Sequence, residues 1–86
     1  MNQIIVLYPN GDVTPITQKE IPTLKQVQDW VKGYVEPVSI DPNFGHEMYV
    51  NEEGLLEGLP ENRFASLVAR QPIVGNAVVF VNFYWE

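Results

Sequence analysis

The segment from residue 49 to residue 62 constrains the fold most strongly, because its composition specifies a local structure at nearly every position. A short apolar run ends at Val50 and leads into Asn51-Glu52-Glu53-Gly54, which has the composition of a type I turn. We expect Gly54 to adopt a positive φ, since glycine accepts that conformation without a Cβ clash. Leu55-Leu56-Glu57 is then expected to pair back as the second, shorter arm of a hairpin.

The end of this segment predicts a break followed by a helix. Gly58 and Pro60 interrupt strand pairing, because glycine weakens a strand and proline has no N–H to donate. Asn62 stands directly before residues 63–70, where its side chain can accept a hydrogen bond from a free N–H at the start of a helix. The residues expected to build the turn and the break are Asn51, Gly54, Gly58, Pro60 and Asn62.

Strands are expected at both ends of the chain, over residues 4–8 and 76–85. Both runs are apolar on their two faces, which is typical of strands inside a sheet. A turn at 9–12 joins the first run to a return strand at 13–17. That strand contains Pro15 and belongs at an edge, and the run at 34–40 contains Pro37, which places it at an edge or a bulge.

Two helices of unequal strength complete the pattern. The first begins after Thr23 as N-cap and ends at Gly33 as a C′ glycine, with an apolar face made of Leu24, Val27, Trp30 and Val31. The second follows Asn62, with Phe64, Leu67 and Val68 as its apolar face. The chain is therefore expected to be a single α+β domain over residues 1–86. Its sheet is antiparallel or mixed, with about five strands and the first helix packed on one face.

Negative charge is concentrated in the middle of the chain, whose formal net charge is −6. Between Gly33 and Asn62 there is no Lys or Arg, and the acids are Glu36, Asp41, Glu47, Glu52, Glu53, Glu57 and Glu61. We expect no direct nucleic-acid binding, because a phosphate-binding surface needs clustered Lys and Arg. Such a segmental negative field instead favours a protein partner. The residues expected to contact it are Glu52, Glu53, Glu57 and Glu61.

No catalytic or cofactor-binding arrangement stands out. The absence of Cys and the presence of one His exclude thiolate sites and centres built from several His. Glu52 and Glu53 are neighbours on a turn and point in different directions, so the alternative to partner binding is a solvated turn tip rather than acid/base catalysis. His46 and Glu47 provide two donors where a metal needs three or four, and a surface loop histidine is expected. We expect no enzyme activity, no metal and no cofactor.

Two short motifs carry a family resemblance. Val50-Asn51-Glu52-Glu53-Gly54 is followed by Gly58-Leu59-Pro60-Glu61-Asn62, then by Ala65 and Ile73-Val74-Gly75, and Gly33-Tyr34-Val35-Glu36 precedes them. This pattern resembles a family of small phage and bacterial domains of unknown function, over roughly half of the chain. The resemblance implies a phage or mobile-element setting and no particular reaction or substrate.

These observations lead to two competing expectations of function. The first is a phage-like, non-catalytic accessory protein that binds a protein partner through an acidic face and can inhibit it. The alternative is a small-ligand or nucleotide binding domain, with a pocket between helix and sheet or at a dimer interface. The apolar run at the N-terminus covers only five residues, too few for a signal sequence or a membrane span. A cytoplasmic location, in a bacterial host, is therefore expected.

The balance between apolar strands and available cover also predicts a homodimer. Two interior strands need cover on both faces, and Phe83-Tyr84-Trp85 adds three aromatic side chains at the chain end. An uncovered apolar patch usually marks an interface, and two-fold pairing is the commonest way to close one. The alternative is that the second helix covers the second face and the aromatic side chains pack under the loop 41–46.

Overall fold

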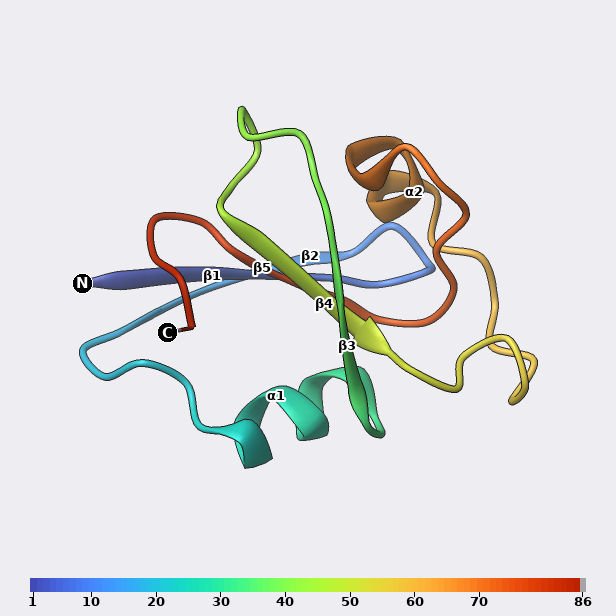
Figure 1. The fold of residues 1–86 in the computed structure, drawn as a ribbon, viewed down its shortest axis with the longest axis horizontal. Helices are drawn as coiled ribbons and strands as arrows, with labels where there is room; N and C mark the ends of the chain where they lie inside the picture. The colour runs from blue at the N-terminus through green and yellow to red at the C-terminus, as the bar shows by residue number, and fades with distance from the viewer. Residues whose placement is uncertain (86) are drawn as a thin grey trace.

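A computed structural model describes residues 1–85, and Glu86, the last residue of the expected domain, lies outside the described residues. The elements in chain order are β1 (Asn2–Leu7), β2 (Val13–Gln18), α1 (Leu24–Val31), β3 (Val35–Val38), β4 (Glu47–Asn51), α2 (Arg63–Ala69) and β5 (Ala77–Phe80). The strands form an antiparallel sheet in the order β2-β1-β5-β4-β3 (Figure 1). The α+β class expected from the sequence is confirmed.

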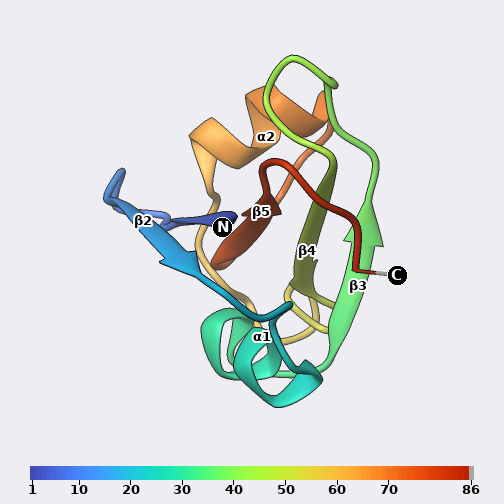
Figure 2. The same ribbon diagram turned by 90° about the vertical axis from the view of Figure 1, so that its left-hand side faces the viewer.

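The two helices lie on opposite faces of the sheet (Figure 2). β5 shows the division, because its side chains alternate between the faces. Val78 and Phe80 pack in the cluster that contains Val27 and Val31 of α1. Ala77 and Val79 pack in the cluster that contains α2. All four residues of β5 are buried, as expected for a strand that is apolar on both faces.

Both edge strands carry a proline, as expected. Bonded and non-bonded pairs alternate along an antiparallel ladder. The N–H of Tyr8 donates to the carbonyl of Asp12 at 3.0 Å, which places the pair of Ile5 and Pro15 at a non-bonded position. The same alternation, counted from the bond between the N–H of Glu52 and the carbonyl of Tyr34, places Pro37 at a non-bonded position of β3. At both prolines the backbone nitrogen, which carries no N–H, therefore points away from the neighbouring strand. An added strand would need a donor at that position.

The first helix begins as expected and ends differently. The N–H of Gln26 donates to the Thr23 hydroxyl at 3.1 Å, and the N–H of Thr23 donates to the Gln26 side chain at 3.0 Å, which forms a capping box. Lys32, with φ 67°, takes the left-handed position, so the expected C′ role of Gly33 is wrong. Gly33 is needed for space, because a Cβ there would lie 2.7 Å from Nδ2 of Asn51.

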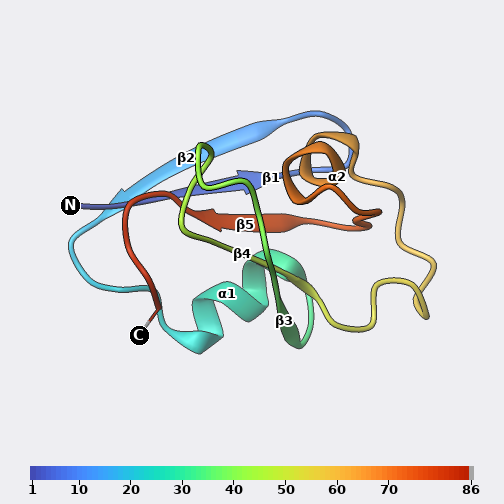
Figure 3. The ribbon, with the colours of Figure 1, turned by 45° about the horizontal axis from the view of Figure 1, so that its top comes forward.

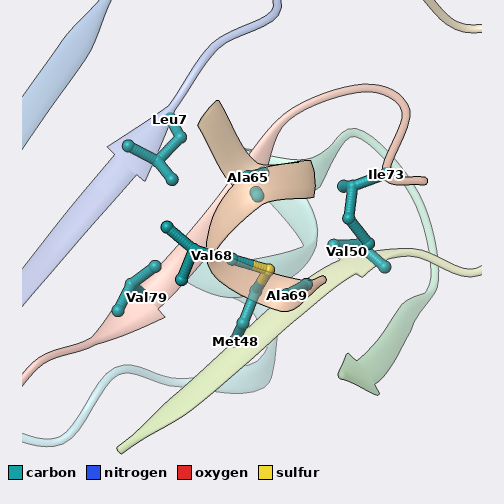
Figure 4. Packing of buried hydrophobic residues seen from close by; sticks show 9 residues of the cluster. Leu7, Met48, Val50, Ala65, Val68, Ala69, Ile73 and Val79 are labelled. Carbon is teal, nitrogen blue, oxygen red and sulfur yellow. The ribbon is translucent and has the colours of Figure 1, made fainter. Parts of the chain in front are cut away.

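The second helix presents a different face to the sheet than its pattern predicts. Its buried residues are Ala65, Val68 and Ala69, which pack against Leu7, Met48, Val50 and Val79 (Figure 4). Phe64 and Leu67, expected in the core, are 43% and 77% exposed. The rotation of the helix is set at its start by the buried side chain of Asn62, and two alanines then allow the helix to approach the sheet closely.

The last strand ends at Phe80 rather than at Trp85, which changes where the terminal aromatic side chains go. Phe83 stacks on Phe80 with a centroid distance of 4.6 Å, although strand alternation to residue 85 would place it on the opposite face. Trp85 meets the ring of Tyr49 edge-on at 4.8 Å and donates from Nε1 to the carbonyl of Pro22 at 2.8 Å. Phe83 and Trp85 thus pack on the α1 face rather than under the loop 41–46. The homodimer stays a prediction, but Phe83 and Trp85, two of the aromatic side chains that motivated it, pack on the α1 face of the same chain.

Candidate interaction surface

The connection from β4 to α2, residues 52–61, is a turn-rich loop that we call the acidic-leucine loop. It extends from the end of β4 at one end of the molecule (Figure 3). Its turns are closed by hydrogen bonds from the N–H of Glu57 to the carbonyl of Glu53 at 2.9 Å and from the N–H of Leu59 to the carbonyl of Gly54 at 3.0 Å. Leu55 and Leu56 at its tip are 82% and 87% exposed.

The hairpin expected in this segment is therefore wrong. Residues 52–58 form consecutive turns, and Leu55-Leu56-Glu57 does not pair as a strand arm. The N–H groups of Glu57 and Leu59 donate to carbonyls of the loop itself, at Glu53 and Gly54, and not to β4. The two glycines Gly54 and Gly58, with three residues between them, are the signal in the sequence that fits consecutive turns.

Asn51 anchors the beginning of the loop. Its side chain is buried, and Nδ2 donates to the carbonyls of Val31 and Lys32 at 3.3 and 3.2 Å. Its Oδ1 accepts from the N–H of Glu53 at 2.8 Å. The side chain therefore joins the C-terminal end of α1 to the first turn of the loop.

Asn62 anchors the end of the loop. Its side chain is fully buried, and Oδ1 accepts from the N–H of Ala65 at 3.2 Å, which confirms the expected N-cap. Nδ2 donates to the carbonyls of Leu7 and Gly75 at 3.0 and 2.9 Å. One side chain thus joins α2, β1 and the segment that leads into β5, which was not foreseen.

The remaining turn residues act in different ways. Gly58 has a positive φ of 67°, with open space where a Cβ would stand. Gly54 does not have a positive φ, so that expectation is wrong; a Cβ on Gly54 would lie 2.8 Å from Cγ2 of Val74. The carbonyl of Pro60 accepts from the N–H of Gly75 at 2.8 Å. Gly54 is therefore required for close packing of the loop on the segment before β5.

The four glutamates expected to bind a partner, Glu52, Glu53, Glu57 and Glu61, are all exposed and surround the two leucines in sequence. Within residues 1–85, the two ion pairs join Lys25 to Asp29 and Arg70 to Asp41. The carboxylates of the loop are thus not neutralised by those basic residues. The loop presents apolar side chains within a negative field.

A hollow of about 370 Å³ lies beside the loop on the α2 side of the sheet. Its floor includes Val50 and Ile73, which are buried, and its wall includes Leu55 and Leu56. β3 contributes Glu36, and the loop contributes Glu52, both exposed carboxylates. The surface therefore combines apolar walls with a negative rim. The two leucines and Glu36 were not among the residues expected to bind.

Another polar cluster holds the end of the chain. The carboxylate of Glu47 accepts from the N–H of Trp85 at 2.7 Å, and Nδ1 of the exposed His46 lies 2.8 Å from the carbonyl of Val81. Burial raises the pKa of Tyr49 to about 12, with the charge of Glu47 and a hydrogen bond to it as further causes. Glu47 and His46 thus hold the C-terminal segment, and Glu47 also bonds to Tyr49.

Two further properties of residues 1–85 concern metal ions and membranes. No three His, Cys, Asp or Glu side chains gather there in a way that could hold a metal ion. None of the helices in this part of the chain is long and apolar enough to cross a membrane.

Comparison with known proteins gives a family and no function. No curated protein and no solved structure matches the chain. The family model described as Domain of unknown function (DUF3846) matches residues 1–82. The chain therefore belongs to this family of domains of unknown function.

Proposed function

We propose that this protein is a non-catalytic accessory protein that binds a protein partner through the acidic-leucine loop and inhibits or redirects it. The observation that carries this proposal is the exposure of Leu55 and Leu56, 82% and 87%, in a loop anchored by buried asparagines at both ends. Large apolar side chains at a loop tip gain most when a partner covers them. Each is worth roughly 1.5–3 kcal/mol on full burial.

The anchoring of the loop supports this role energetically. A partner that binds a mobile loop must offset the cost of ordering it, at about 0.5–1.5 kcal/mol for each immobilised side chain. Here Asn51, Asn62 and the turn hydrogen bonds hold the backbone in place before binding. The surrounding carboxylates then contribute to association rate and to the choice of partner more than to affinity.

A phage-like role in the cytoplasm of a bacterial host is part of the same proposal. It is supported by the two motifs of the loop, residues 50–54 and 58–62, and their resemblance to small phage and bacterial domains. A small acidic protein with a rigid binding loop suits a role in which it occupies the surface of a host protein.

The test compares two variants of equal fold. In the first, Glu52, Glu53 and Glu61 are replaced by Gln, and in the control Asp12→Asn, Glu20→Gln and Asp29→Asn remove the same number of exposed carboxylates elsewhere. A partner captured by the wild-type protein from a bacterial lysate is purified, and its association rate is measured at low and high ionic strength. We expect a slower rate and a flatter salt dependence for the loop variant alone. Equal rates at low ionic strength for wild type and loop variant would contradict the proposal.

The alternative function, binding of a small ligand or nucleotide, is best placed at a hollow of about 330 Å³ near Tyr84. Tyr49, His46 and Glu47 also line it. The Glu47 carboxylate and the His46 ring already bond to the C-terminal segment, so fewer polar groups remain for a ligand. Protection of the Tyr84 ring from iodination by a nucleotide would favour this alternative over the protein binder.

A further inference from the structure

We infer that the hollow beside the acidic-leucine loop receives apolar side chains from a basic amphipathic helix of the partner. This inference rests on the proposed function and deepens it, because it assigns the chemistry of the partner. The hollow combines Leu55 and Leu56 of the loop with the apolar floor of the sheet. A volume of about 370 Å³ is at the lower end of ligand-binding pockets, which leaves room for the ends of a few side chains.

The place of the hollow in the fold explains why it is open. α2 covers Leu7, Met48 and Val79 on its side of the sheet, and the segment after it covers Val50 through Ile73. Towards the β3 edge this cover stops, and Val38 remains only partly buried. The apolar area next to β3 is therefore bounded by the loop and by the segment 71–74, with no further element of the described chain above it.

The charge of the lining indicates which class of partner segment fits the hollow. Two exposed carboxylates, Glu36 and Glu52, belong to the lining of the hollow, and no Lys or Arg does. A Lys or Arg next to the inserted apolar residue would meet these carboxylates at the rim. A second copy of this chain that used the same face would bring equal charges together across a two-fold axis. The occupant is thus a basic segment of a different protein.

The backbone of the edge strand β3 favours a partner helix over a partner strand added to the sheet. β3 is the edge strand beside the hollow, and Pro37 stands at an outward-facing, non-bonded position of its ladder. Addition of a strand needs a continuous row of backbone donors and acceptors. An amphipathic helix needs only side-chain contacts, with apolar residues on one face and Lys or Arg at its sides.

The experiment uses a designed peptide of Leu and Lys with helical spacing, and a matched peptide with Glu in place of Lys. Binding to the full chain is followed by amide chemical shifts. The Leu–Lys peptide is expected to shift the amides of Glu36, Val38, Leu55 and Leu56, and the Leu–Glu peptide is expected not to bind. The variant Leu55→Ser/Leu56→Ser should weaken the Leu–Lys peptide at least tenfold, and Leu24→Ser, which changes an exposed leucine of α1, should not.

The possible outcomes separate this inference from the proposed function. If Glu36→Gln/Glu52→Gln weakens the Leu–Lys peptide while the double serine variant does not, the helix-in-hollow inference is overturned and the acidic face remains. If the peptide shifts amides of α1 or of the outer face of α2 instead, the inference is also overturned. Shifts of the hollow that depend on protein concentration without peptide would assign it to a second copy and overturn the inference. Both leucines are largely exposed, so the serine variants are expected to fold, and circular dichroism checks this.

Discussion

The two faces of the sheet are covered by different means. On the α1 face, the helix is supplemented by the end of the chain, where Phe83 and Trp85 pack with Phe80. On the α2 face, the cluster is aliphatic and rich in alanine, and large apolar side chains of α2 point away from it. The chain therefore closes one face with its own aromatic residues and leaves large apolar side chains exposed on the other. We therefore expect the α1 face to contribute most to stability, and the proposed recognition surface lies on the α2 side.

Removal of an aromatic side chain from the α1 face is expected to have the greatest effect on stability. Phe83→Ala should lower the free energy of unfolding by about 3 kcal/mol, because it removes a buried ring stacked on Phe80. Phe64→Ala on α2 is the matched control, and its cost should stay below about 1 kcal/mol, since that ring is 43% exposed. Urea unfolding measures both. Equal losses would mean that the two faces do not differ as described.

The packing of the loop on the α2 side is tested at its two glycines. Gly54→Ala should cost about 1–3 kcal/mol through contact with Val74, and Val74→Ala in the same chain should recover much of that cost. Gly58→Ala should cost about 1 kcal/mol through its positive φ, and Gly58→Asn should cost less, because Asn tolerates the left-handed region. Thermal melts of these variants measure the loss of stability at each glycine. A loss at Gly54 that Val74→Ala does not relieve would contradict the close-packing role.

Alkaline pH probes the α1 face through Tyr49. The folded chain holds the Tyr49 proton up to about pH 12, whereas the unfolded chain releases it near pH 10. The contribution of this group to stability is thus complete below about pH 10 and is lost as the pH rises towards 12. Unfolding free energies across this range should fall less steeply for Tyr49→Phe than for wild type. Identical pH profiles would show that Tyr49 is not held neutral by burial and by Glu47.

The smallest expected effect concerns self-association. The homodimer predicted from the sequence now depends on the outer face of α2, where Leu67 is 77% exposed and Phe64 meets Phe44 edge-on at 6.3 Å. We expect sedimentation equilibrium at high concentration to give a mass above 9.8 kDa, and Leu67→Glu to remove the increase. Leu24→Glu on α1 is the control and should not. A single 9.8 kDa species at every concentration would rule out the dimer.

Sequence reasoning was most successful where independent local signals agreed. Thr23 as cap and the spacing of Val27 and Val31 both predict α1, and Pro15 and Pro37 both mark edge strands. Predictions from the sequence were wrong where contacts between distant residues decide the local structure. Nothing near Asn62 in the sequence shows that its side chain binds β1 and thereby rotates α2. The need for a glycine at position 54, next to Val74, is likewise visible only in the folded chain.

In the proposed function, the acidic-leucine loop is a rigid surface that presents Leu55 and Leu56 before any partner binds. Backbone ¹⁵N relaxation of the free protein tests it most directly, because it reports motion of those two amides relative to the sheet. We expect order parameters of about 0.8 or higher for Leu55 and Leu56, similar to those of β1. Values below about 0.6 would show a flexible loop and would contradict the claim.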